Sequence, residues 1–133
     1  MSSAGLALQE AMRAALIAND GVKAALGGAY VFDEVPRGAP ASYVEFTGLD
    51  TRDWSTFGQP GLEHFVSLVV RSNSRGRKQA QEISAAVQTA LDGAALLLAG
   101  HRLVNLSMVF WSVVKSGQTY GASLRFRAAT EPL

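Results

Sequence analysis

The sequence contains no cysteine. This absence excludes disulfide bonds, thiolate nucleophiles and cysteine metal sites, and it fits an intracellular or self-assembling protein. Long apolar runs are missing too. The longest, around residues 94–99, is far shorter than the roughly 20 residues that a membrane-spanning helix needs. The first residues have no positive cluster followed by an apolar run, so we expect no signal peptide and no membrane partner.

A strong excess of charge of either sign is also absent. The net charge is +1, which argues against a general nucleic-acid binder. Residues 1–70 hold four basic side chains against eight acidic ones, a balance of −4, and residues 71–133 hold eight against three, a balance of +5. The two halves can neutralise each other within one subunit. Alternatively, an acidic face of one copy meets a basic face of the next, and heterologous contacts of this type can close into rings.

What is present indicates one globular domain over residues 1–133. The chain is 48% hydrophobic and 17% charged, and its length suits a single core. Periodicity and turn residues predict a first helix, capped by Ser2 or Ser3 and ending at about residue 19, and further helices at 22–26 and up to about 91. The apolar stripe of the first helix is Leu8, Met12, Ala15, Leu16 and Asn19, and that of the last is Ala80, Ile83, Val87, Ala90 and Leu91. Strands are predicted at 29–32, 43–47, 62–72, 102–115 and 119–129. A long hairpin tip is predicted at 48–61. The order α-α-β-β-β-α-β-β predicts the α+β class, an antiparallel β-sheet with helices packed against it.

Two strands have distinct faces. In strand 62–72, one face carries His64, Val66, Leu68 and Val70, and the other carries Glu63, Phe65, Ser67, Val69 and Arg71. Apolar residues on both faces predict a sheet that is covered on two sides, at least in the assembled state. In the last strand an apolar face of Leu124, Phe126 and Ala128 alternates with a basic face of Ser123, Arg125 and Arg127.

The sequence gives no pattern typical of catalysis or cofactor binding. His64 and His101 lack metal-like spacing, and Asp50 and Asp53 are too few for a cation site or for acid–base catalysis. No serine has the strand-turn-helix context of a nucleophile, and the glycine pair at 27–28 lacks the phosphate-loop pattern. We therefore expect no catalytic residue, no metal and no cofactor.

Two groups of residues are candidates for a protein interface. Trp54 and Phe57, with Arg52 and Asp53 beside them, lie in a polar loop bounded by glycines, where an aromatic side chain gains little unless something covers it. Tryptophan is enriched at interface hot spots. The alternative is that the hairpin folds back and buries both rings within the subunit.

The second group is a basic patch at a strand end and a helix start. It comprises Arg71, Arg75, Arg77 and Lys78. Positive charge at a helix start opposes the helix dipole instead of complementing it. The patch therefore either meets an acidic surface or a phosphate backbone, or belongs to a solvated loop.

Several segments, in order along nearly the whole chain, carry a resemblance to a known family. They are the helix Leu6-Ala-Leu-Gln-Glu-Ala-Met-Arg-Ala-Ala-Leu, Tyr30-Val-Phe-Asp-Glu-Val-Pro, Thr51-Arg-Asp-Trp-Ser-Thr, Glu63-His, Ser74-Arg-Gly-Arg-Lys, Leu98-Ala-Gly-His-Arg-Leu and Arg125-Phe-Arg-Ala-Ala-Thr-Glu. With these segments the sequence resembles the tail-completion, or tail-terminator, family of siphophage-like particles, including gene-transfer particles.

The resemblance implies a structural protein of the virion, located at the junction of tail and neck and assembled in the host cytoplasm. It implies a homohexameric ring that caps the tail tube, stops its polymerisation and joins the tail to the head-side neck (stopper) protein. DNA would cross the central channel only in transit, without sequence-specific binding. The family supplies no catalytic residues to transfer.

Three alternatives remain open. The nearest is a head-tail connector, an adaptor or stopper ring of the neck, which composition does not distinguish from a terminator. A small nucleic-acid-binding module, led by the basic patch, would show a steep dependence of DNA affinity on salt. An enzyme would need a concave pocket with convergent titratable groups.

Overall fold

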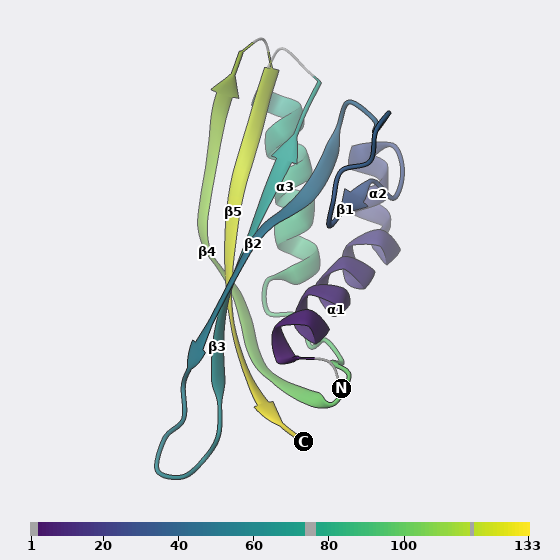
Figure 1. Cartoon of the computed structure of the whole chain (residues 1–133). Helices are drawn as coiled ribbons and strands as arrows, with labels where there is room; N and C mark the ends of the chain where they lie inside the picture. The colour runs from purple at the N-terminus through teal and green to yellow at the C-terminus, as the bar shows by residue number, and fades with distance from the viewer. Residues whose placement is uncertain (1–2, 74–76, 118) are drawn as a thin grey trace.

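The computed structural model describes residues 3–73, 77–117 and 119–133, and within them a five-stranded sheet carries helices on one face (Figure 1). The elements are α1 (Ala4–Ala18), α2 (Asp20–Leu26), β1 (Val31–Phe32), β2 (Tyr43–Asp53), β3 (Leu62–Arg71), α3 (Arg77–Leu91), β4 (His101–Ser116) and β5 (Thr119–Pro132). Their order confirms the predicted sequence of elements and the α+β class. In the described part of the chain, no helix is long and apolar enough to cross a membrane.

The first two helices begin at side-chain caps. The Ser3 hydroxyl accepts a hydrogen bond from the Leu6 amide at 3.1 Å, and the Asn19 side chain accepts one from the Val22 amide at 3.0 Å. These bonds satisfy amides that have no partner within a helix. Gly27 ends α2 with a φ of 84°, in the left-handed region that glycine adopts without penalty. Ser3 was one of two predicted caps, and the other, Ser2, lies outside the described residues.

The sheet order is β1-β2-β3-β5-β4. The pairs β2–β3, β3–β5 and β5–β4 are antiparallel, as predicted. The short β1 differs, because it pairs with β2 in parallel, with Val31 opposite Val44. A parallel pair needs a connection that returns to the same end of the sheet, and the loop 33–42 provides it.

The strand β2 is longer than the sequence predicted. The hairpin tip expected at 48–61 is wrong for residues 48–53, which continue β2, so the tip spans 54–61. Gly48 does not end the strand because it lies at a β-bulge, where the register shifts between Phe46 and Gly48. Glycine inside a strand often marks such a bulge.

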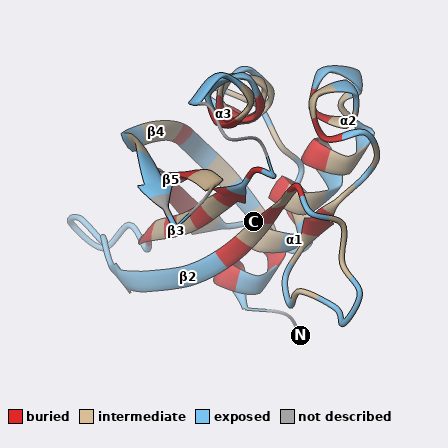
Figure 2. Ribbon diagram, turned by 90° about the horizontal axis from the view of Figure 1, so that it is seen from above, coloured by how far each residue is buried: buried red, intermediate tan, exposed pale blue. Residues whose placement is uncertain are grey.

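The core lies between the helices and one face of the sheet, where Figure 2 shows the buried residues gathered. It includes Leu8, Met12 and Leu16 of α1, Ile83, Val87 and Leu91 of α3, Val66, Leu68 and Val70 of β3, and Leu124 and Phe126 of β5. These residues confirm the predicted helical stripes, and they show that the Val66 face of β3 and the apolar face of β5 point inward.

A buried serine that the sequence did not single out joins α3 to β4. The Ser84 hydroxyl donates to the Ala80 carbonyl at 2.6 Å and accepts from the Trp111 indole nitrogen at 3.0 Å. The indole N–H of Trp111 thus has a partner, although part of its ring remains exposed. This hydrogen bond holds the indole nitrogen of Trp111 against α3.

Leu16→Ala tests the core. Leu16 is fully buried, and removing its side chain leaves a cavity, so we expect a loss of about 2–5 kcal/mol in the free energy of unfolding measured with urea. The matched control is Leu6→Ala on the same helix, where the side chain is half exposed and the expected change is within about 0.5 kcal/mol. Equal losses in both variants would contradict the assignment of the buried stripe.

Candidate protein interface

Strand alternation places a set of polar, aromatic and apolar side chains on the face of the sheet turned away from the helices. We call this the outer face, and it includes Asp50 and Arg52 of β2, Glu63 and Phe65 of β3, and Arg125 and Arg127 of β5. The predicted division of β3 into two faces is confirmed. Among the described residues, the helices cover only the opposite face, so cover on both sides remains a prediction for an assembly (Figure 1).

Glu63, the second residue of β3, lies on the outer face between β2 and β5. Its carboxylate accepts hydrogen bonds from the Nε of Arg52 and from the Nε of Arg127, the latter at 2.5 Å. Although it faces away from the core, Glu63 is only 6% exposed because the two guanidinium groups and their stems cover it. The hydrogen bond from Arg52, followed by that from Arg127, holds the pKa of Glu63 below its ordinary value.

The same arginines cover aromatic rings. The guanidinium carbons of Arg125 and Arg52 lie 4.7 Å and 5.6 Å from the centroid of the Phe65 ring, and that of Arg127 lies 5.3 Å from the Trp54 ring. These are cation–π distances. Trp54 therefore folds back in part, yet 42% of its surface stays exposed. The predicted burial within the subunit is therefore partial for this ring, and its contact with another chain stays a prediction.

Phe57, in contrast, is fully exposed at the hairpin tip. The backbone amides and carbonyls of Thr56 and Gln59 bond each other at 3.0 Å and 2.7 Å, which leaves a two-residue turn. Phe57 and Gly58 occupy this turn with φ angles of 43° and 78°. A turn with positive φ at both central residues favours asparagine, aspartate and glycine, so a phenylalanine there is unusual. Intramolecular burial, one of the two predicted alternatives, is wrong for this ring.

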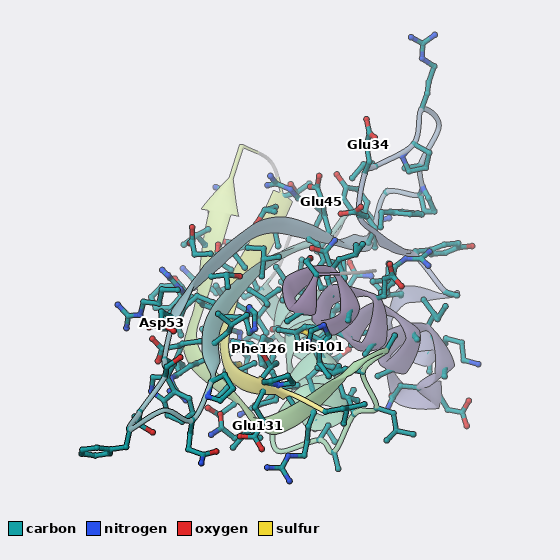
Figure 3. The ribbon with its side chains drawn as sticks, turned by 60° about the horizontal axis from the view of Figure 1, so that its bottom comes forward. Glu34, Glu45, Asp53, His101, Phe126 and Glu131 are labelled. Carbon is teal, nitrogen blue, oxygen red and sulfur yellow. The ribbon has the colours of Figure 1, made fainter. Side chains whose placement is uncertain are left out.

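Asp53, the fourth residue of the predicted loop interface, is at the base of the hairpin. Its carboxylate accepts a hydrogen bond from the Ser55 hydroxyl at 2.7 Å. Figure 3, which brings this end of the molecule forward, shows Asp53, His101 and Glu131 there, while Glu34 and Glu45 lie away from them. Asp53 thus helps to shape the turn that displays Phe57.

The basic patch is partly satisfied within the chain. The Arg77 guanidinium lies 5.3 Å from the Tyr120 ring, and Lys78 pairs with Glu82 at 3.9 Å. Arg71 is exposed at the end of β3. Arg75 lies outside the described residues. The structure therefore brings Arg71, Arg77 and Lys78 to the start of α3 and the end of β3, as the sequence predicted.

The sequence did not single out the edge strand β4. It pairs with β5 on one side, and its exposed apolar side chains are Val104, Val109, Phe110, Trp111 and Val114. Long apolar edges favour pairing with another chain, and β4 reduces this tendency with two register shifts along its length. The apolar run at 108–111, too continuous for one face of a strand, was the available signal.

A cavity of about 310 Å³ lies where β4 begins. It is lined by Ala95, Leu96, Leu97, Leu98, His101, Arg102, Leu103 and Leu133. Sequence reasoning noted this apolar run only as too short to span a membrane. Two of the lining side chains, Leu97 and Leu133, are almost fully exposed.

The histidines have structural surroundings. His64 is fully buried, with its Nδ1 at 2.8 Å from the Thr51 hydroxyl and its Nε2 at 2.8 Å from the Thr130 hydroxyl. Burial, and after it the charge of His101, lowers the pKa of His64, which favours the neutral ring. Within the described residues, no cluster of three or more histidine, aspartate or glutamate side chains is suited to a metal ion.

Glu63→Gln tests the outer face through its pH dependence. Because the folded-state pKa of Glu63 is lowered, its contribution to stability is present above the ordinary pKa of about 4.3 and is lost as the pH falls through the folded-state value. We expect the variant to have a lower urea midpoint at pH 7 and a shallower loss of midpoint below pH 5. In the control Glu82→Gln, at an exposed pair, both quantities should stay near wild type.

The sequence and the fold are similar to those of known proteins. Residues 10–131 match the family model described as tail completion protein gp17. A chain in the solved virion of a native gene transfer agent particle is 32% identical, with a TM-score of 0.88, over 98% of this chain and 99% of that chain. No curated protein matches the sequence. The chain therefore belongs to the tail completion protein gp17 family, and it is a structural protein of the virion tail and not an enzyme.

Proposed function

We propose that the protein is a tail terminator. Six copies form a ring on the finished tail tube, stop its polymerisation and join the tail to the head-side neck (stopper) protein. DNA crosses the ring in transit, without sequence-specific binding. The observation that supports this function is the family match, together with the likeness over almost the whole chain to one chain in the virion of a native gene transfer agent particle. Residues 1–133 act as one domain in this role.

Several exposed features support self-assembly. A heterologous ring needs two different surfaces on each subunit, one for each neighbour. The chain offers the hairpin tip on one flank and, elsewhere, the cavity at the start of β4. Isolated exposed apolar residues are common on soluble proteins, whereas gathered ones mark interaction sites. We assign Trp54, Phe57, Arg52 and Asp53 to contacts with a neighbouring subunit or with the tube or neck protein.

Ion pairs between basic and acidic side chains are a second possible source of contacts, either within one subunit or between neighbours in the proposed ring. The pairs Arg127–Glu63 and Arg125–Asp50 join the basic and acidic halves within one subunit, which favours the simpler interpretation for the outer face. The described residues of the basic patch do not take part in these pairs, because Arg71 ends β3 and Arg77 and Lys78 begin α3. We assign Arg71, Arg75, Arg77 and Lys78 to a contact with the acidic half of the adjacent subunit.

The mass and shape of the purified protein, alone and with tail tubes, test the proposed function. We expect light scattering to give six subunits and negative-stain microscopy to show six-fold rings, either free or at tube ends. Tubes assembled with the protein should also stop growing. A monomer that ignores tubes but binds portal-side proteins would support the adaptor or stopper alternative instead.

The double variant Arg77→Glu/Lys78→Glu tests the basic patch. An exposed ion pair contributes about 0–1 kcal/mol, so each lost contact should weaken ring association by up to about fivefold at low salt. The wild-type ring should itself weaken as salt screens the contact. The matched control is Lys115→Glu on β4, and circular dichroism checks that both variants fold. A ring that is unchanged at low salt would remove the patch from the interface.

A further inference from the structure

Three large apolar side chains are far more exposed than any other in the described part of the chain. Phe57, Leu97 and Leu133 are 105%, 95% and 87% exposed, and the next, Phe110, is 53% exposed. They fall into two places. Phe57 is alone at the tip of the hairpin, whereas Leu97 and Leu133 line the same cavity.

The hairpin presents Phe57 as a projecting knob. The tight turn between Thr56 and Gln59 fixes the backbone on either side of it. Residues 54–61 carry no charged side chain, so the tip can enter an apolar site without removing a charge from water. The positive φ of Phe57 is a costly conformation for a bulky residue, and such outliers concentrate at binding sites.

The cavity is suited to an aromatic ring. Five of its lining residues are leucines, and its volume is about 310 Å³. A closed apolar cavity of roughly 150 Å³ holds a benzene molecule, and this site is larger and open to solvent on one side, so that a ring can enter it. The titratable side chains that line it, His101 and Arg102, both engage other parts of the chain, Arg102 through its ion pair with Glu131. A phenyl group therefore fits the cavity in both size and chemistry.

The knob and the cavity lie at one end of the molecule but on opposite flanks. Figure 1 shows the hairpin between β2 and β3 extending at one lower corner, with the start of β4 and the chain end at the other. The view from above in Figure 2 also shows the hairpin directed away from the body of the molecule. In a chain arranged in this way, Phe57 does not reach the cavity of its own subunit. It can enter the cavity of a neighbour at the same level along the axis of the proposed ring. Such a contact is heterologous, and a rotation that closes generates a ring.

We infer that Phe57 of one copy inserts into the cavity formed by Leu97 and Leu133 of the next copy. The inference rests on the proposed ring and names the contact that closes it. When this contact is repeated around the ring, each copy inserts its Phe57 into one neighbour and accepts the Phe57 of the other. An aromatic side chain buries about 150–250 Å² in such a site, together with the two leucines that are otherwise exposed.

Disulfide cross-linking tests the contact directly, because the chain has no cysteine of its own. The variant Gln59→Cys/Ala95→Cys keeps Phe57 and Leu97 and places one thiol beside the knob and one at the cavity. Since a disulfide requires Cα atoms within about 7 Å, mild oxidation of the ring should give a ladder of covalent species up to six subunits. A mixture of the two single variants should give dimers only. The matched control Gln59→Cys/Val114→Cys, with its second thiol on β4, should give no ladder.

Phe57→Ala provides a second measurement. Loss of an interface hot spot of this kind should weaken self-association about 30-fold or more, as measured by light scattering across a dilution series. The control Phe110→Ala, at the next most exposed aromatic ring, should change it far less. Thermal unfolding of the monomer checks that both variants fold.

The outcomes separate this contact from the proposed function. If the wild type forms rings, but Gln59→Cys/Ala95→Cys gives no ladder and Phe57→Ala rings stay intact, the contact is overturned and the terminator function stands. If Phe57→Ala rings form but no longer attach to tail tubes, the knob docks on the tube protein and the inference is wrong. If the wild type forms no ring, either free or on tubes, the proposed function and the contact both fail.

Discussion

The alternation of side chains along β3 is the constraint on which the rest of the structure depends. β3 is paired on both sides, and every second residue, as at Val66, Leu68 and Val70, is fully buried beneath the helices. A shift of one residue in register would exchange the two faces, so these buried residues fix the register of both neighbouring strands. The same alternation directs Glu63 and Phe65 to the outer face, where the chain needs another way to cover them.

Arginine provides that cover. A buried carboxylate is costly unless its oxygens are hydrogen-bonded, and Glu63 receives a bond from an arginine on each neighbouring strand. A guanidinium can bond a carboxylate at its edge and stack on an aromatic ring with its face, which lysine does not match. Arg52 and Arg127 each do both. The carboxylates of Glu63 and Asp50 on the outer face are therefore paired with arginines within one subunit, whereas the uncharged hairpin tip leaves Phe57 exposed.

Local signals predicted much of the fold. The cap at Ser3, the restart of the helix near residue 20 and the apolar stripes of α1 and α3 depend on neighbours within about four residues, so they can be inferred from the sequence. The extension of β2 could not be inferred, because Gly48 is equally typical of a turn and of a bulge. Only pairing with β3 decides between them.

The candidate interface was less predictable because it depends on contacts far apart in the chain. Trp54 and Phe57 have the same glycine-bounded setting in the sequence, yet only Trp54 lies beneath a side chain from another strand, Arg127. No local pattern distinguishes the two rings. The cavity likewise forms only where the loop before β4 meets the end of β5, so its leucines were visible only as an apolar run.

The conformation of Phe57 has a physical consequence for assembly. A left-handed conformation costs a non-glycine residue about 1–2 kcal/mol, and the isolated subunit carries this cost together with a fully exposed ring. In return, the hydrogen bonds of the two-residue turn fix the backbone from which the side chain projects before any contact is made. Association normally loses free energy when loops and side chains become ordered, and a group that is already fixed loses less. On the inferred contact, the pre-ordered turn therefore lowers the entropic cost of closing each interface, and six equivalent interfaces share that benefit.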